Sequence, residues 1–168
     1  MAWVSTNEKP ITLRSACADD VTAISRIWYE GWCDGHLGHV ADDLVTARTA
    51  ESFDVRAAQR VNDTTVAIVG DHVVGFVMVV DDEVEQVYVS REHRGSGVAA
   101  VLLAEAERLV RVNGHQRAWL AVVAGNTRAR NFYERNGWID EGLFDYPAAG
   151  GDEPISVPAH RYVKRLGN

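Results

Sequence analysis

The sequence predicts an α/β domain in which helices flank one mixed sheet, and three observations lead to this expectation. Short apolar runs typical of strands alternate with segments whose apolar residues recur every three or four positions. The chain has 168 residues, which is the size of one domain. It contains neither an internal repeat nor a low-complexity linker. Residues 1–168 are therefore expected to form a single domain, with residues 1–10 disordered.

The first half of the chain is expected to contain one strand, two helical regions and an antiparallel meander. Asp19 and Asp20 can cap the first helix, and the glycines Gly31 and Gly35 indicate a break near its end. The Gly70-Asp71 pair favours a hairpin turn between two of the strands. In chain order we predict a strand over 11–14, a helix from 21, a broken helical region over 42–61, and strands over 64–69, 73–80 and 84–90.

The second half alternates helices and strands. Asn113-Gly114 can close a helix in a left-handed conformation, and Asn126 or Thr127 can begin the next one. Three prolines and the pair Gly150-Gly151 lie within 145–159, which predicts a long irregular connection there. The expected elements are a helix over 98–112, a strand over 118–123, a helix that ends at Gly137, and paired strands over 139–144 and 160–166.

The most informative segment is a basic, glycine-rich turn between a predicted strand and a predicted helix. Gly95 and Gly97 allow an anion to approach the backbone, and the free N–H groups of the helix start point outward. A Walker loop would end in Gly-Lys-Ser/Thr, and no such ending follows Gly97. A dinucleotide fingerprint would begin at the strand end, whereas residues 91–94 intervene here. A pyrophosphate group of another cofactor is the expected ligand.

Two motifs resemble those of the GNAT superfamily of N-acetyltransferases. Arg94-x-x-Gly97-x-Ala99 is similar to the Gln/Arg-x-x-Gly-x-Gly/Ala motif that binds the pyrophosphate of acetyl-CoA. The segment from Asn126 to Trp138 resembles Asn-x-x-Ala-x-x-Phe-Tyr-x-x-x-Gly-Phe, with Trp138 in place of phenylalanine. The two motifs span roughly residues 83–138, in the order and spacing of that family.

The resemblance implies a fold and a set of cofactor contacts. It implies a mixed, mostly antiparallel sheet that splays apart at a wedge, where acetyl-CoA binds as the acetyl donor and no metal is needed. The pantetheine arm would hydrogen-bond to strand backbone as an added strand does. The residues implied to contact the cofactor are Val87, Tyr88, Val89, Arg94, Gly95, Ser96, Gly97, Val98, Ala99, Asn126 and Arg130.

The resemblance also places candidate catalytic groups. Tyr133 occupies the position of the family's general acid, and the motif favours this role over the alternative of a core aromatic beside Phe132. Glu83 and Glu85 are candidate bases, and a water chain is the alternative. Strand alternation predicts that both glutamates share one face with Val87 and Val89.

The acceptor pocket is expected to involve the first two helices and the last hairpin. Trp28, Trp32 and His36 recur every four residues and could form one aromatic face of a helix. Core packing is the better explanation for Trp28, and the sequence leaves Trp32 and His36 undecided. The net charge of −7 argues against nucleic-acid binding and suits a cationic acceptor.

The function that these features imply is an N-acetyltransferase. It would move an acetyl group from acetyl-CoA to a primary amine of a small molecule by direct attack in a ternary complex. The alternatives are a protein or peptide N-acetyltransferase and a non-catalytic acyl-CoA-binding sensor of the same fold. We find no long apolar segment and only two cysteines, so a cytoplasmic enzyme without a membrane partner is expected. A homodimer is expected by analogy with the family.

Overall fold

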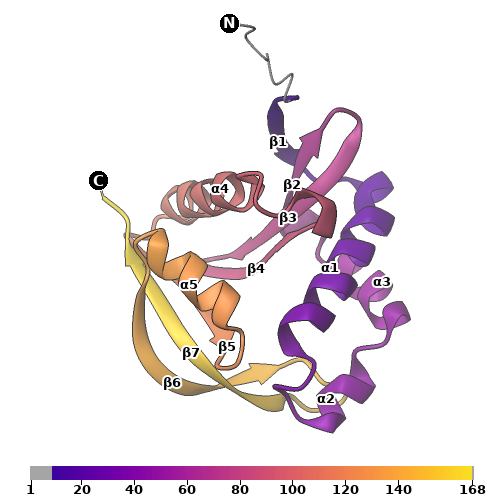
Figure 1. The fold of residues 1–168 in the computed structure, drawn as a ribbon, viewed down its shortest axis with the longest axis vertical. Helices are drawn as coiled ribbons and strands as arrows, with labels where there is room; N and C mark the ends of the chain where they lie inside the picture. Colours follow the sequence, from indigo (N-terminus) through magenta and orange to yellow (C-terminus); the bar gives the residue numbers. More distant parts are fainter. Residues whose placement is uncertain (1–8, 168) are drawn as a thin grey trace, which may run out of the picture.

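One sheet of seven strands runs through the computed structural model, which describes residues 9–167, and helices cover both of its faces (Figure 1). The strands lie in the order β1-β2-β3-β4-β5-β7-β6. Their bounds are β1 Ile11–Ser15, β2 Thr64–Val69, β3 His72–Val80, β4 Glu83–Val89, β5 Arg117–Val123, β6 Ile139–Ala148 and β7 Ile155–Arg165. The helices are α1 Val21–His36, α2 Asp42–Ala47, α3 Ala50–Gln59, α4 Val98–Val112 and α5 Thr127–Arg135, with short 3-10 turns η1 Ala18–Asp20, η2 Val61–Asp63 and η3 Arg91–His93.

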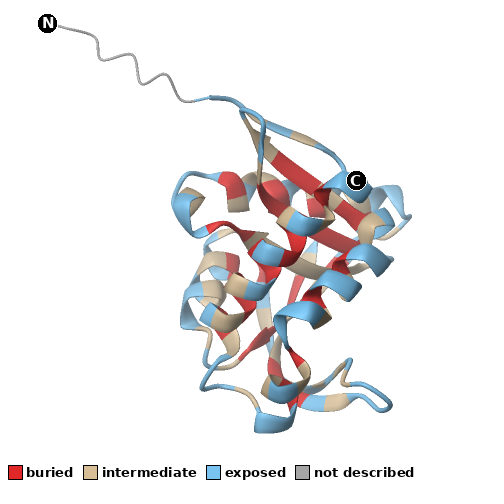
Figure 2. Ribbon diagram, turned by 90° about the vertical axis from the view of Figure 1, so that its right-hand side faces the viewer, coloured by how far each residue is buried: buried red, intermediate tan, exposed pale blue. Residues whose placement is uncertain are grey.

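Two apolar cores lie on opposite faces of the sheet. One contains Leu102 and Leu103 of α4 with Tyr133 of α5, and the other contains Trp28 of α1 with Phe53 of α3. Both cores continue into the central strands, where buried residues are frequent, whereas each helix is buried along one side only (Figure 2). The amphipathic pattern of each helix, which is visible in the sequence, therefore decides which of its faces packs against the sheet.

The sheet opens between its two parallel strands. All other neighbouring strands are antiparallel, but β4 and β5 run parallel and pair only at Glu83 and Trp119. Beside that pair, the Trp119 N–H donates to the carbonyl oxygen of Asp82 at 3.1 Å. The expected mixed sheet with a splayed wedge is confirmed.

A β-bulge in β4 overturns the expected alternation of the two glutamates. Val84 lies opposite Val79 and Gln86 lies opposite Met78, so Glu85 is an extra residue in β4. Val84 consequently shares a core with Val87 and Val89. The expectation that Glu83 and Glu85 lie on the face of those valines is wrong, because the extra residue reverses the alternation.

The last two strands are longer than expected. Strands β6 and β7 pair as far as Ala148 and Ile155, so the predicted irregular connection over 145–159 is wrong. Pro147 is tolerated because β6 is an edge strand. Pro158 is tolerated because the pairing of β7 with β5 ends at Ala159, so that Pro158 lies just beyond it. The hairpin thereby brings Tyr146 back toward β4.

Helix α1 does not break at its glycines. It continues through Gly31 and Gly35 to His36. A Cβ added at Gly31 would lie 2.3 Å from a ring carbon of Tyr88, and one at Gly35 would lie 2.7 Å from the side-chain nitrogen of Asn126. The glycines therefore permit close packing of α1, rather than ending it.

The beginning of α1 also differs from the expected cap. The Asp20 carboxylate accepts hydrogen bonds from the Arg14 guanidinium at 2.7 and 2.9 Å and makes no side-chain cap to α1. The Arg14 guanidinium lowers the pKa of Asp20 to about 2. Apart from Lys9 and Pro10, the segment 1–10 that was expected to be disordered lies outside the described residues. Over residues 9–167, we find no helix long and apolar enough to cross a membrane.

Candidate active site

Two cavities meet where the sheet opens. The first, the inner cavity, has a volume of about 300 Å³ and lies among α1, the α2–α3 region, β4, β5 and the β6–β7 hairpin. The second, the loop cavity, has a volume of about 380 Å³ and lies among β4, the turn after it, the start of α4 and α5. Both are lined by Val87, Tyr88, Asn126, Ala129 and Tyr133. A ligand in one cavity can therefore meet a ligand in the other at these residues.

The turn before α4 has the backbone geometry that the predicted anion site requires. Gly95 and Gly97 have φ angles of 76° and 87°, and a Cβ added to either would meet no atom within 4 Å. In the protein without a ligand, these two positions therefore require glycine for their left-handed backbone conformation, and not for lack of space. The first bond of α4 runs from the Val101 N–H to the Gly97 carbonyl oxygen at 3.2 Å, so the N–H groups of residues 98–100 precede it and can bind an anion.

Only some of the residues in this turn that were predicted to contact the cofactor line the loop cavity. Arg94, Gly95, Gly97 and Ala99 line it. Ser96 instead donates its hydroxyl hydrogen to the carbonyl oxygen of His93, and Val98 is buried in the core beneath α4. The Val98 side chain is therefore unavailable to a ligand, whereas the Ser96 hydroxyl is exposed but already donates within the turn.

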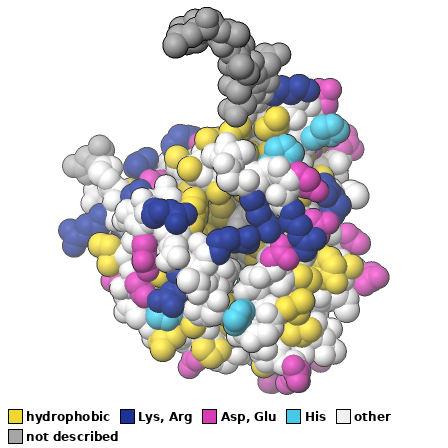
Figure 3. All heavy atoms as spheres, in the orientation of Figure 1, with side chains coloured by type: hydrophobic (Ala, Val, Ile, Leu, Met, Phe, Trp, Pro, Cys, Tyr) yellow, Lys and Arg dark blue, Asp and Glu magenta, His cyan; other side chains and the backbone are white. Residues whose placement is uncertain are grey.

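An ion-pair cluster fixes the turn to α1. The Asp34 carboxylate accepts from Arg91 at 2.8 and 3.0 Å and pairs with Arg94 at 2.8 Å. The Arg91 guanidinium, together with Arg94, lowers the pKa of Asp34 to about 2. Figure 3 shows Lys and Arg side chains beside a hollow on this face, which matches the basic lining of the loop cavity. Arg94 is thus held in place before any ligand arrives.

Helix α5 contributes a different arginine from the expected one. Arg130 donates to the Tyr162 hydroxyl at 3.2 Å and to the Ala124 carbonyl oxygen at 3.2 Å, and it pairs with Asp140 at 3.4 Å. Arg130 is not among the residues that line the loop cavity, so its predicted contact with the cofactor stays a prediction. Arg128 and Arg135 line that cavity instead. They share a helical stripe with the cavity residue Phe132, a periodicity that could have revealed them in the sequence.

Tyr133 stands at the junction of the cavities. Its side chain is 9% exposed and packs against Phe132 and Trp138. Burial raises the pKa of its hydroxyl, so the group stays protonated at neutral pH. The two interpretations of Tyr133 are therefore compatible, because the ring belongs to the core while the residue lines both cavities.

The two glutamates of β4 both line the inner cavity, but their partners differ. Glu85 pairs with the Arg60 guanidinium. Glu83 accepts a hydrogen bond from the Tyr146 hydroxyl at 2.7 Å. Burial raises the pKa of Glu83, although the bond from Tyr146 acts in the opposite direction. Glu83 is therefore the better proton acceptor, since Glu85 is already neutralised by a cation.

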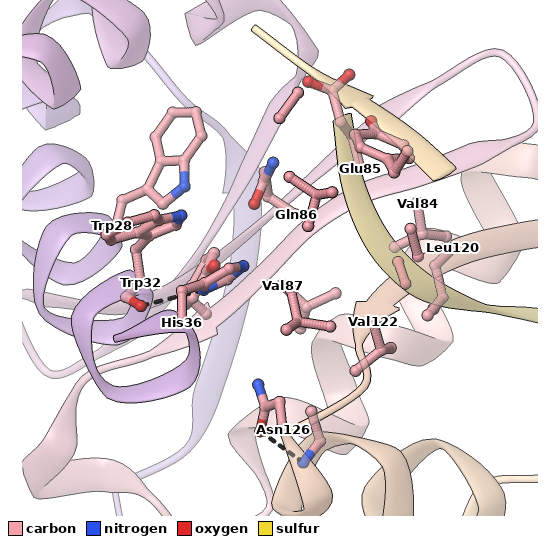
Figure 4. Close-up of a pocket in the computed structure, with 18 of the residues that line it drawn as sticks. Trp28, Trp32, His36, Val84, Glu85, Gln86, Val87, Leu120, Val122 and Asn126 are labelled. Carbon is pink, nitrogen blue, oxygen red and sulfur yellow. Dashed lines mark hydrogen bonds between the residues drawn. The ribbon is translucent and has the colours of Figure 1, made fainter. Parts of the chain in front are cut away.

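The aromatic residues of α1 form one wall of the inner cavity. Figure 4 shows Trp28, Trp32 and His36 on α1, across the cavity from Val87. Trp28 and Trp32 also belong to a core, and the Trp32 and His36 rings stack with centroids 4.9 Å apart. Burial lowers the pKa of His36 to about 4. Because its Nδ1 donates to the Trp32 carbonyl oxygen at 3.0 Å, Nε2 is left as an acceptor.

Three further residues of the inner cavity were missed by sequence reasoning. Arg48 follows α2, Arg56 lies on α3 and Tyr146 lies on β6. Nothing in their local sequence distinguishes them from surface residues, because packing between distant segments brings them to the cavity. Within the described part of the chain, no group of three His, Cys, Asp or Glu side chains could hold a metal ion.

An opened mixed sheet, a helix start with free N–H groups and a tyrosine between two cavities are the features that the resemblance to the GNAT superfamily implied. The model of the acetyltransferase (GNAT) family matches residues 25–138, and the chain belongs to that family. Comparison with curated proteins gave no match.

Solved structures show the same fold. A GCN5-related N-acetyltransferase from Rhodopseudomonas palustris is 17% identical with a TM-score of 0.73, covering 95% of this chain and 98% of its own. A phosphinothricin acetyltransferase from Sinorhizobium meliloti in complex with acetyl-CoA is 22% identical with a TM-score of 0.69, covering 94% and 89%. The putative acetyltransferase yncA from Salmonella typhimurium with acetyl-CoA is 17% identical with a TM-score of 0.67, covering 95% of each chain.

Proposed function

We propose that this protein transfers an acetyl group from acetyl-CoA to a primary amine of a small molecule by direct attack in a ternary complex. The observation that carries the proposal is the junction of two cavities at Tyr133. Acetyl-CoA would occupy the loop cavity, with its pyrophosphate at residues 94–100 and its arm along β4. The inner cavity, at about 300 Å³, has the size of a small-molecule site and would hold the acceptor.

The attacking amine must first lose a proton. An alkyl amine with a pKa near 10 is mostly ammonium at pH 7, and its deprotonation costs about 4 kcal/mol. Glu83 lines the inner cavity and carries a pKa raised by burial, which makes its carboxylate a stronger base. In the proposed mechanism Glu83 accepts this proton, directly or through water.

The amine nitrogen then bonds to the thioester carbon, and the carbon–sulfur bond breaks. The coenzyme A thiolate has an ordinary pKa near 8.5, so it leaves more readily when a hydroxyl donates to the sulfur. Tyr133 stays protonated because burial raises its pKa. It is the proposed hydrogen-bond donor to the leaving sulfur, and if its proton moves to the thiolate, the proton that the amide nitrogen still has to lose restores the hydroxyl.

The first experiment is a thiol-release assay. Acetyl-CoA is incubated with the protein and with small amines, polyamines, amino acids or peptides, and free thiol is followed against controls without acceptor. Release with a small amine supports the proposal. Release with peptides alone supports the protein acetyltransferase alternative, whereas acetyl-CoA binding without release from any acceptor supports the sensor.

Replacement of Glu83 tests the base. We expect Glu83→Gln to lower kcat about tenfold or more and to remove the acid limb of its pH profile, because that limb reports protonation of the carboxylate. Tyr146→Phe is the matched variant. It removes the hydrogen bond that lowers the Glu83 pKa, so it should move the acid limb to higher pH without abolishing it. An unchanged profile in Glu83→Gln would assign the proton to water or Glu85.

A pair of arginine variants on α5 tests the cofactor site. Arg128→Gln should raise the KM for acetyl-CoA about three- to tenfold, because Arg128 lines the loop cavity. Arg130→Gln should leave that KM unchanged and lower the Tm, because Arg130 bonds to Tyr162, Ala124 and Asp140. Steady-state kinetics and thermal melts of both variants provide the comparison. Equal effects on KM would show that the loop cavity does not hold the cofactor.

A further inference from the structure

The inner cavity is lined by buried hydrogen-bond donors that have no acceptor. Among the described residues, the indole Nε1 of Trp28, the Nε of Arg48 and an Nη of Arg56 are buried without a hydrogen-bond partner. All three residues line this cavity. Buried N–H groups are almost always paired, so a cluster of unpaired donors requires an explanation.

Arg48 is the most unusual of the three. Its residue is 8% exposed, and its guanidinium makes neither a hydrogen bond nor an ion pair with any described residue. Burial lowers its pKa, but an arginine remains charged at neutral pH. A buried charge without a partner is strongly unfavourable, so a ligand that supplies the partner would be favoured there.

Arg56 adds a second cation at the same cavity. Its guanidinium carbon lies 4.4 Å from the Trp28 ring centroid, and no carboxylate pairs with it in residues 9–167. Burial lowers the pKa of Arg56 to about 10, and the charge of Arg48 contributes to the shift. The two guanidinium groups therefore repel each other, which an anion bound between them would relieve.

The acidic residues of the cavity have other direct partners, although the charge of Glu85 also raises the pKa of Arg56 in part. Glu85 is paired with Arg60, and Glu83 is hydrogen-bonded to Tyr146. Arg60 also has a buried Nε without a hydrogen bond, but the carboxylates of Glu85 and Asp63 accompany it. Arg48 and Arg56 are thus the cations that remain available inside the cavity.

We propose that the acceptor carries an oxyanion group, such as a carboxylate or phosphonate, that Arg48 and Arg56 bind while its amine points to Tyr133. This inference rests on the proposed acetyl transfer. Both arginines line the inner cavity and neither lines the loop cavity, whereas Tyr133 lines both. The acceptor would therefore be zwitterionic, like an amino acid. A cationic acceptor, which the net charge of −7 suggests, would then carry a negative group as well.

Matched acceptors test the charge requirement. Each amino acid is assayed for thiol release together with its carboxamide, which keeps the amine and removes the negative charge. For wild type we expect kcat/KM to favour the acid at least tenfold. Arg48→Gln should raise KM for the acid at least fivefold and remove most of that preference, and Arg48→Lys should restore part of it. Arg108→Gln, which removes a surface partner of Glu105 on α4, should keep the wild-type preference.

Thermal melts give a second measurement that does not depend on turnover. The amino acid that supports thiol release, or failing that inorganic phosphate, should raise the Tm of wild type and not that of Arg48→Gln. Without ligand, Arg48→Gln should melt at or above the wild-type temperature, because it removes an unpaired buried charge. A clear fall in Tm would show that Arg48 has a structural partner and would overturn the proposal.

The outcomes separate this inference from the proposed function. Thiol release with carboxamides at least as fast as with acids would overturn the oxyanion site and leave acetyl transfer standing. An anion-dependent rise in Tm that requires Arg48, without thiol release from any amine, would support the oxyanion site and overturn acetyl transfer.

Discussion

Tyr133→Phe is expected to lower kcat at least tenfold while leaving the affinity for acetyl-CoA unchanged. A tenfold loss corresponds to about 1.4 kcal/mol in the activation barrier, which is modest for a general acid. The substitution removes one hydroxyl and keeps the ring that packs against Phe132 and Trp138. Stability should therefore change little, and the loss should lie in the chemical step.

The measurement pairs steady-state thiol release with acetyl-CoA binding by calorimetry. Tyr162→Phe is a matched control, because its hydroxyl bonds to Glu134 and Arg130, away from the two cavities. That variant should lose stability and keep kcat. Unchanged kcat in Tyr133→Phe would remove the hydroxyl from the mechanism and leave the residue as part of the core.

Gly31→Ala is expected to destabilise the protein by about 2–3 kcal/mol, the cost of overpacking a core. Alanine normally favours a helix more than glycine does, and helix propensity alone predicts that the substitution raises the free energy of unfolding by about 1 kcal/mol. The added Cβ would lie 2.3 Å from a ring carbon of Tyr88, and the helix would have to move from β4. We expect a fall in Tm of about 4–12 °C and a higher KM for acetyl-CoA, since Gly31 lines the loop cavity.

A double-mutant cycle with Tyr88→Ala identifies the cause. If the clash with the ring destabilises Gly31→Ala, the double variant should lose clearly less stability than the two single variants combined. Additive losses would instead show that the glycine is needed for its backbone, and not for its contact with Tyr88.

Local features of the chain were predictable because each depends on residues close in sequence. Gly95 and Gly97 adopt the left-handed conformation that a tight turn before α4 requires. Helix α4 ends at Val112, before Asn113-Gly114 as expected. The order of strands and helices also follows from periodicity, since each element carries its own apolar pattern.

The prediction for β4 failed because one extra residue changed which face of the strand the preceding side chains occupy. The extra residue Glu85 in β4 turned both glutamates away from Val87, and no local signal marks a bulge of this kind. Arg128 and Arg130 are two positions apart on α5, and of these two only Arg128 lines one of the two cavities. The motif located this helix correctly, but its rotation against the sheet decided which arginine is available.

The sequence by itself therefore determined the family, the order of the elements and the glycine-rich turn before α4, because these depend on short-range patterns. Only the tertiary structure decided the content of the inner cavity. Arg48 follows α2, whereas Arg56 and Tyr146 belong to α3 and β6, and they meet because helices and strands far apart in the chain pack together. Whether a charged side chain is buried without a partner depends on that packing, which no local pattern of residues records.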